Sequence, residues 1–157
     1  MKVMILYESF FGNTEKIAEA VAEPFGNAVL LKRIDNVNLN ELKEAELLIV
    51  GSATRGFRPC EKTKAFLKSI PENGLKDVRV AAFDTRIMLE TIKSKPLRFL
   101  VKTGGYAAKH IANTLQTKGG KLVAPPEGFL VTGEEGPLAD GERERARNWS
   151  AQFIQQG

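Results

Sequence analysis

The sequence predicts an α/β fold in which a doubly wound, parallel sheet of five strands is covered by helices on both faces. Short apolar runs alternate along the chain with segments whose apolar residues recur at helical spacing. Right-handed crossovers between parallel strands place helices on both faces of such a sheet. A length of 157 residues, 43% hydrophobic and 27% charged, fits a single domain over residues 1–157.

The first half of the chain supplies three strands and two helical segments. Its apolar runs predict strands at 3–7, 28–31 and 47–50. Between the first two runs, small and aliphatic residues recur at helical spacing over 13–23, and Pro24 ends that helix. Residues 39–44 add one or two helical turns, so strand and helix alternate as the fold class requires.

The second half supplies two more strands and three helices. Helical spacing predicts helices at 61–69, 106–117 and about 141–155, the last of which buries Ala146, Trp149, Phe153 and Ile154. A fourth strand at 78–83 stops at Asp84-Thr85-Arg86. The fifth strand consists of 122–124 and 129–132 and is broken by Pro125-Pro126, because proline cannot donate a backbone hydrogen bond to its neighbour strand.

A single cysteine and a single histidine limit the chemistry of the chain's own side chains. Cys60 has no partner for an intrachain disulfide, and His110 alone cannot complete a Cys/His metal site. We therefore expect no catalytic residue and no metal site, and we expect the chemistry to come from a bound cofactor. No apolar run reaches the roughly 18 residues of a membrane span, so a soluble, cytoplasmic protein that does not enter the membrane is expected.

The net charge of +4 averages two oppositely charged parts of the chain. Residues 55–121 hold 15 Lys and Arg against 5 Asp and Glu, whereas the remainder holds 8 against 14. This basic segment favours an anionic ligand or partner, the alternative being a solvated lysine-rich face. The segment lacks regularly interleaved aromatic residues, so nucleic-acid binding is not expected.

Loops at the carboxyl ends of the strands form the ligand crevice of a doubly wound sheet. Here these loops are 8–14, 52–59 and the segment that follows residue 83. The first carries hydroxyls at Ser9 and Thr14 and an amide at Asn13, and Gly12 lets the backbone turn directly before a helix. A helix N-terminus with free amides attracts phosphate without a lysine. The loop therefore predicts a phosphate site, with a plain turn and helix cap as the alternative.

The segment Tyr7-Glu8-Ser9-Phe10-Phe11-Gly12-Asn13-Thr14, followed by Glu15-Lys16-Ile17-Ala18, resembles the phosphate loop and first helix of flavodoxins. Gly51-Ser52-Ala53-Thr54-Arg55-Gly56 resembles the first flavin-ring loop, and the aromatic final helix around Trp149 extends the resemblance over the whole chain. It implies a flavodoxin-like three-layer sandwich of strand order 2-1-3-4-5, in a short-chain form, that binds FMN non-covalently.

The same resemblance implies two groups of residues that bind the FMN. The phosphate would be held by Ser9, Phe10, Phe11, Gly12, Asn13 and Thr14. The ring would be lined by Ala53, Thr54, Arg55, Gly56, Phe57, Asp84, Thr85 and Arg86. Flavodoxins usually place aromatic side chains on both sides of the ring. Here the first ring loop offers only Phe57 and the second offers none, since Tyr106 is expected to pack within a helix.

Positive charge in the ring loops also departs from the family pattern, because flavodoxins tend to be acidic around the flavin. Arg55, Arg58 and Arg86 would stabilise the reduced, anionic flavin. We therefore expect a redox potential above that of a typical flavodoxin.

The function that the resemblance implies is electron transfer through the flavin, with a redox partner protein that the basic segment predicts to be anionic, by a monomer or a homodimer. Whether the chain is also a self-contained enzyme stays open, with the carrier favoured. One alternative is an FMN-dependent NAD(P)H:quinone-type oxidoreductase in which 87–103 form a substrate lid. The other is a flavin-free interaction module on the same fold. A receiver domain is not favoured, because Glu8 stands alone after the first strand.

Overall fold

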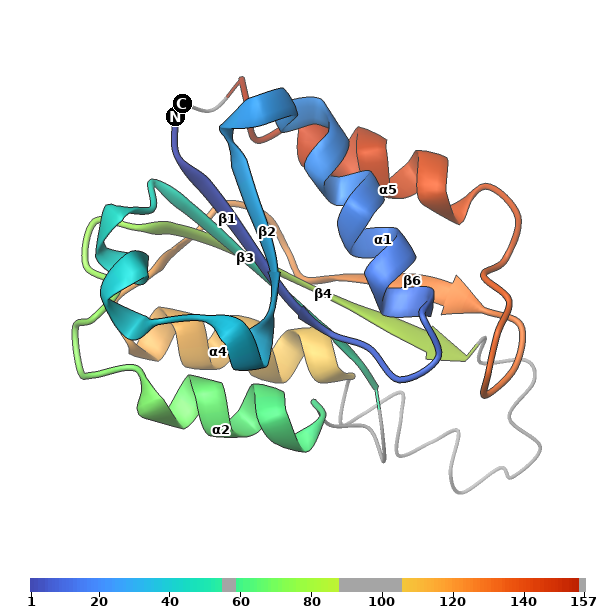
Figure 1. The fold of residues 1–157 in the computed structure, drawn as a ribbon, viewed down its shortest axis with the longest axis horizontal. Coiled ribbons are helices and arrows are strands. Elements are labelled where there is room, and N and C mark those ends of the chain that lie inside the picture. The colour runs from blue at the N-terminus through green and yellow to red at the C-terminus, as the bar shows by residue number, and fades with distance from the viewer. Residues whose placement is uncertain (55–58, 88–105, 156–157) are drawn as a thin grey trace.

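The computed structural model describes residues 1–54, 59–87 and 106–155, which form a three-layer α/β sandwich (Figure 1). The strands are Val3–Glu8 (β1), Val29–Arg33 (β2), Leu47–Ala53 (β3), Arg79–Ile87 (β4), Lys121–Leu122 (β5) and Glu127–Val131 (β6). The α-helices are Asn13–Ala22 (α1), Glu61–Ser69 (α2), Ala107–Thr117 (α4) and Glu142–Ala151 (α5). All strand pairs within the sheet are parallel, in the order β2-β1-β3-β4-β5, with β6 also paired to β4. The predicted fold class and strand order are confirmed.

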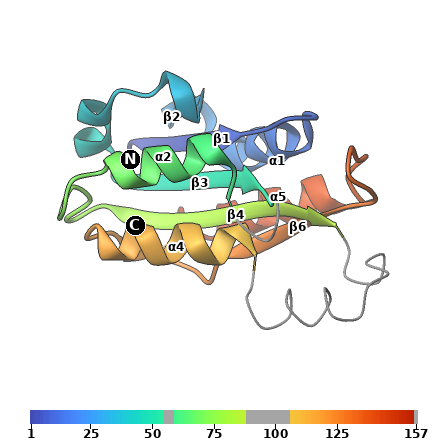
Figure 2. The ribbon, with the colours of Figure 1, turned by 90° about the horizontal axis from the view of Figure 1, so that it is seen from below.

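Helices α1 and α5 cover one face of the sheet, and α2 and α4 cover the other (Figures 1 and 2). Consecutive residues of a strand point to opposite faces. Ile5 of β1 therefore packs into the core beneath α1 and α5, while the next residue, Leu6, packs into the core beneath α2 and α4. Because helices cover both faces of the sheet, the middle residues of each central strand are buried whichever face they point to. They are therefore apolar without interruption, which explains the apolar runs in the sequence.

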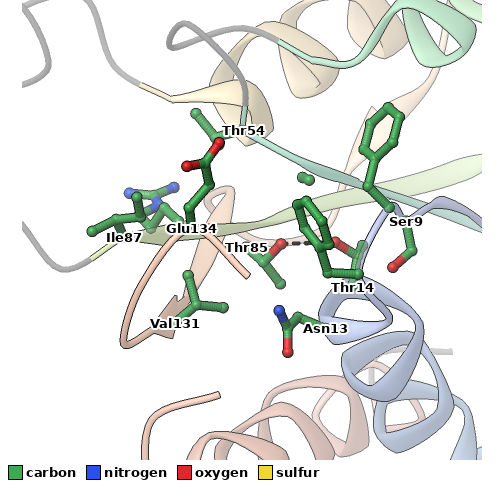
Figure 3. Close-up of a pocket in the computed structure, with 12 residues that line it drawn as sticks. Ser9, Asn13, Thr14, Thr54, Thr85, Ile87, Val131 and Glu134 are labelled. Atoms are coloured by element: carbon green, nitrogen blue, oxygen red, sulfur yellow. Dashed lines mark hydrogen bonds between the residues drawn. The ribbon is translucent and has the colours of Figure 1, made fainter. Parts of the chain in front are cut away.

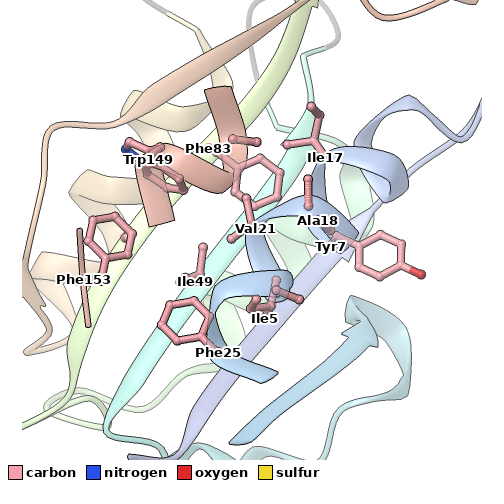
Figure 4. Packing of buried hydrophobic residues seen from close by; sticks show 14 of the residues in the cluster. Ile5, Tyr7, Ile17, Ala18, Val21, Phe25, Ile49, Phe83, Trp149 and Phe153 are labelled. Carbon is pink, nitrogen blue, oxygen red and sulfur yellow. The ribbon is translucent and has the colours of Figure 1, made fainter. Parts of the chain in front are cut away.

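A cluster of aromatic rings fills the centre of the core beneath α5. The Trp149 ring makes edge-to-face contacts with Phe83, Phe129 and Phe153 at centroid distances of 6.1, 5.9 and 4.9 Å (Figure 4 labels three of these rings). The predicted burial of Ala146, Trp149 and Phe153 is correct. The predicted burial of Ile154 is wrong: this residue lies beyond the end of α5 and is 44% exposed. The Phe83 ring reaches across to β3, where Gly51 leaves room for it: a Cβ atom at position 51 would overlap the ring.

The predicted fifth strand is present as two strands that lie one after the other along β4. β5 pairs with Arg79 and Val80 of β4, and β6 pairs with residues 83–87 of the same strand. Four residues, 123–126, separate β5 from β6. On β4, only two residues lie between Val80, which pairs with the end of β5, and Phe83, which pairs with the start of β6. The extra length and the missing donors of Pro125-Pro126 interrupt the ladder, so the sheet has six strands rather than five.

Several element boundaries differ from the prediction. β3 and β4 run on to Ala53 and Ile87, so Asp84-Thr85-Arg86 belongs to a strand and not to a loop. The last helix ends at Ala151, short of the predicted 155, and residues 39–44 form a 3₁₀ helix. Tyr106 is the N-cap of α4 rather than a residue inside it. None of the helices in the described part of the chain is long and apolar enough to cross a membrane.

Replacing Gly51 by alanine tests the packing of Phe83. The new methyl group would force the ring out of place, and overpacking of this kind typically costs about 1–3 kcal/mol. We expect Gly51→Ala to lower the midpoint of urea unfolding with an unchanged slope. The matched control is Gly133→Ala, whose Cβ would meet nothing closer than the Gly136 carbonyl oxygen at 3.7 Å. Equal stability of the two variants would contradict the packing argument.

Candidate functional site

A cavity of about 340 Å³ opens at the carboxyl ends of the central strands (Figure 3). Nine of the fourteen predicted binding residues line it, namely Ser9, Phe10, Phe11, Asn13, Thr14, Ala53, Thr54, Thr85 and Arg86. Gly12 and Asp84 are not in its lining, although both neighbour residues that are. Arg55, Gly56 and Phe57 lie outside the described residues, as do Arg58 and all but the first residue of the predicted lid at 87–103.

Three lining residues were not predicted: Ile87, Val131 and Glu134. Ile87 ends β4 and Val131 ends β6, with Glu134 in the loop that follows. Parallel topology brings the carboxyl end of the last strand to the same edge as the others. That rule pointed to the segment after residue 131, but the segment carries no recognisable motif.

The backbone of the loop at 9–14 turns so that the chain leads directly into α1. Gly12 adopts a left-handed conformation with φ of 88°, which favours glycine, and forms the N-cap of the helix. Its N–H donates to the Ser9 hydroxyl at 3.1 Å, which closes the turn. The first N–H groups of a helix have no acceptor within the helix, and they carry the positive end of its dipole. Since Asn13 and Thr14 open the helix and line the cavity, this end lies at the cavity wall.

Two hydrogen bonds fix this loop to distant parts of the chain. The hydroxyls of Thr14 and Thr85 share a hydrogen bond of 2.7 Å, drawn as a dashed line in Figure 3. The Asn13 side-chain amide donates to the backbone carbonyl of Glu135 at 3.0 Å. The first loop is therefore held to β4 and to the segment after β6, and the cavity wall is pre-formed.

Apolar side chains form the rim of the cavity. Phe10 and Phe11 are 53% and 51% exposed, and Ile87 and Val131 also line the cavity. A phenyl ring cannot hydrogen-bond to a phosphate, so Phe10 and Phe11 can offer an anion only their backbone. Their rings instead supply flat apolar surface next to the polar helix end, which suits a ligand with one anionic and one aromatic part.

Asp84 lies behind the cavity wall, where it holds Arg86. Its carboxylate is fully buried and accepts two hydrogen bonds from the Arg86 guanidinium, each of 2.7 Å. It also accepts the N–H of Ala108, in the first turn of α4, at 2.8 Å. The guanidinium lies 3.8 Å from the centre of the Tyr106 ring, and on its other side Gly128 of β6 leaves room for it, because a Cβ there would overlap it.

This arrangement changes the electrostatic role expected of Arg86. Burial raises the pKa of the Asp84 carboxyl, and the hydrogen bonds and charge of Arg86 oppose that rise. Arg86 lines the cavity, but its positive charge is paired with Asp84 and does not stand alone there. Of the three arginines expected to raise the redox potential, one is therefore largely neutralised.

The base of the second loop is held by α2. A carboxylate oxygen of the buried Glu8 accepts both the N–H and the hydroxyl of Thr63, at 2.9 and 2.8 Å, in the first turn of that helix. The N–H of Cys60, the N-cap, donates to the Ser52 hydroxyl at 3.1 Å, and its thiol donates to the Ala53 carbonyl at 3.3 Å. The helix and the end of β3 are thus joined directly below the cavity.

The lining favours binding over acid–base catalysis. Among the described residues, the charged side chains of the lining are Arg86, which is paired, and the exposed Glu134. Within residues 1–54, 59–87 and 106–155, no group of three His, Cys, Asp or Glu side chains could hold a metal ion.

Comparisons with known proteins give one family model and several solved structures of the same fold. The family model described as Flavodoxin matches residues 5–149. A flavodoxin from the domain Archaea is 24% identical, with a TM-score of 0.75 and coverage of 99% of this chain and 98% of that one. Oxidised flavodoxin 2 from Bacillus cereus is 20% identical, with a TM-score of 0.77 and full coverage of both chains. Rubredoxin oxygen:oxidoreductase from Desulfovibrio gigas is 23% identical, with a TM-score of 0.72. This match covers 99% of this chain and 36% of that one. No curated protein sequence matches it.

Replacing Arg86 by methionine tests the buried ion pair. The Asp84 carboxylate would lose its counter-charge, and breaking a buried pair in this way costs about 3–5 kcal/mol. We expect the free energy of unfolding, measured with urea at pH 7, to fall by this amount. This loss should shrink as the pH falls toward the unfolded-state pKa of aspartate, because protonation removes the unpaired charge.

The double variant Asp84→Asn/Arg86→Met should recover most of the lost stability. As a control, Arg147→Met removes an arginine from an exposed pair with Glu23, and such pairs contribute at most about 1 kcal/mol. A pH-independent loss, or a double variant as unstable as Arg86→Met, would show that the pair is not what stabilises this region.

Proposed function

Because the chain belongs to the flavodoxin family, as the match over residues 5–149 shows, we propose that it binds FMN in the cavity at the carboxyl edge of the sheet and carries electrons through it. Flavin-binding electron transfer is the activity of this family, and its members bind FMN. When bound, the flavin supplies the redox chemistry, and the protein supplies placement and electrostatics.

The observation that carries the proposal is the loop at 9–14, with a left-handed Gly12 at the start of α1 and polar side chains at the cavity wall. Ser9, Asn13 and Thr14, together with backbone N–H groups of the loop and first turn, would hold the phosphate. The Ser9 oxygen accepts the Gly12 N–H, so its own proton remains to be donated to a phosphate oxygen. Phe10 and Phe11 would contribute backbone to the phosphate and apolar surface to the rest of the ligand.

The wall beside this loop combines apolar with polar side chains, and this mixture supports placing the flavin ring there. Ala53, Thr54, Thr85 and Arg86 line it, together with the unpredicted Ile87 and Val131. Arg55, Gly56 and Phe57 follow Thr54 directly in the sequence and belong to the proposed ring site for that reason. Asp84 acts as a positioning residue, because it reaches the cavity through the side chains of Arg86 and Thr54, which line it.

As an electron carrier the protein requires a redox partner protein. Segment 55–121 holds 15 basic and only 5 acidic residues, and this positive charge supports an anionic partner. We also propose that the protein works in the cytoplasm as a monomer or homodimer.

Replacing Ser9 by alanine tests the phosphate site. Loss of one hydrogen bond to a charged group, worth about 1.5–3 kcal/mol, should weaken FMN binding roughly 10- to 100-fold. Riboflavin has no phosphate, so its affinity should hardly change. Quenching of flavin fluorescence measures both affinities in one titration.

The matched control is Ser69→Ala, which removes a hydroxyl that donates to the Phe66 carbonyl in α2. It should leave both affinities unchanged. If Ser9→Ala weakens FMN and riboflavin equally, the loop does not hold the phosphate. A purified protein that is colourless and takes up neither flavin would instead favour the flavin-free interaction module.

Steady-state kinetics separate a carrier from an oxidoreductase. The FMN-loaded protein, mixed with NADPH or NADH and a quinone, should oxidise the nucleotide no faster than free FMN does. It should still exchange electrons with small redox proteins. Sustained nucleotide oxidation that saturates with quinone would contradict the carrier proposal and establish the NAD(P)H:quinone-type alternative.

A further inference from the structure

The two helical faces of the molecule differ in charge. Helices α2 and α4, which lie side by side in Figure 2, carry four lysines and one histidine against a single glutamate. Helices α1 and α5, on the opposite face, carry four basic and four acidic residues. Four of the fifteen basic residues of segment 55–121 therefore lie on this helical face, which is the more basic of the two.

A groove of about 320 Å³ runs between α2 and α4 on this face. It is lined by Pro59, Lys64, Leu67, Lys68, His110 and Thr114, and we call it the α2–α4 groove. Lys64 and Lys68 are four residues apart, so both reach the same side of α2. Leu67 is buried, whereas Lys68 is exposed and Lys64 is half-buried, which gives the groove an apolar floor and a positively charged rim.

Much of this charge is available to a partner. Lys64 pairs at 3.1 Å with Glu61, a side chain that is itself 90% exposed, and such surface pairs are weak. Lys68 and Lys109 are exposed, and neither forms an ion pair within the described parts of the chain. An acidic surface would meet these lysines without first displacing a strong internal partner.

The α2–α4 groove is attached to the walls of the cavity. The N–H of Ala107, which starts α4, donates to the hydroxyl of Thr54 at 3.4 Å, and His110 follows one turn later. At the other helix, Pro59 precedes Cys60, whose thiol donates to the carbonyl of Ala53. Thr54 and Ala53 both line the cavity. One end of the groove therefore adjoins the edge of the molecule at which the cavity opens.

We propose that the α2–α4 groove is the docking surface for an acidic redox partner protein. The inference rests on the proposed function, because the groove's place beside the cavity matters only if a flavin is bound there. A protein surface fits it better than a small anion does. Lys64 and Lys68 lie one turn apart along α2, and Lys109 lies on α4 outside the lining. Among the described lining residues, no buried polar side chain converges on one point as in a built anion site. Spread charges of this kind steer and orient a partner.

Charge reversal on this face tests the docking surface. The probe is a plant-type ferredoxin, an acidic one-electron carrier, reduced with dithionite and mixed with the FMN-loaded protein in a stopped-flow instrument. The double variant Lys68→Glu/Lys109→Glu should lower the second-order rate of electron transfer about tenfold at low ionic strength. The difference from the unmodified protein should vanish as salt is added.

The matched control is Lys16→Glu/Arg143→Glu, which makes the same change in net charge on the opposite face. It should lower the rate much less. Equal effects of the two double variants would mean that only net charge matters and would overturn the proposed surface.

A second measurement keeps this inference separate from the flavin proposal. Oxidised ferredoxin is titrated into the flavin-free protein while backbone amide signals are followed by NMR. Shifts confined to α2 and α4 would support the groove even if no flavin binds, whereas shifts on α1 and α5 would overturn it. Inorganic phosphate at matched ionic strength is the competitor. If it saturates the same amides and displaces the ferredoxin, the groove is a small-anion site and not a protein docking surface.

Discussion

Asp84 and Arg86 lie two residues apart on β4, so their side chains leave the same face of the strand and meet as a buried ion pair. The carboxylate also holds the first turn of α4 through the Ala108 N–H, and the guanidinium rests between Tyr106 and the space left by Gly128. One interaction thus sets the cavity wall, the start of α4 and the approach of β6. Because loss of Arg86 would leave the fully buried Asp84 carboxylate without its counter-charge, these three parts keep one relative geometry.

The sequence predicted the fold well because its signal is local. A parallel strand covered on both faces must be apolar throughout, and each such run is recognisable without knowledge of its neighbours. The ends of β3 and β4 were missed because Ser52, Asp84 and Thr85 are polar yet buried. Their hydrogen-bond partners are supplied by Cys60, Ala108 and Thr14, which are close in space only after folding.

The residues of the candidate site also fall into those that local sequence reveals and those that it does not. The loop at 9–14 was predictable, since its turn, its polar groups and its helix are contiguous. Ile87, Val131 and Glu134 were not, since they reach the cavity from strand ends that carry no motif. The sequence also assigned Arg86 a free charge at the flavin, and the structure pairs that charge with Asp84. The contribution of Arg55 and Arg58 to the redox potential stays a prediction.

The interrupted fifth strand bears on how copies of this chain meet one another. An open sheet edge invites another strand to pair with it, which is a common route to aggregation. Here β5 has two residues, and Pro125-Pro126 offer no N–H donors. The outer side of β6 is already taken: Thr132 donates to the Pro137 carbonyl and Ala139 donates to the Leu130 carbonyl, each at 2.9 Å. This side of the molecule is thus protected against strand exchange between copies, and association here must proceed through side chains rather than through a shared sheet.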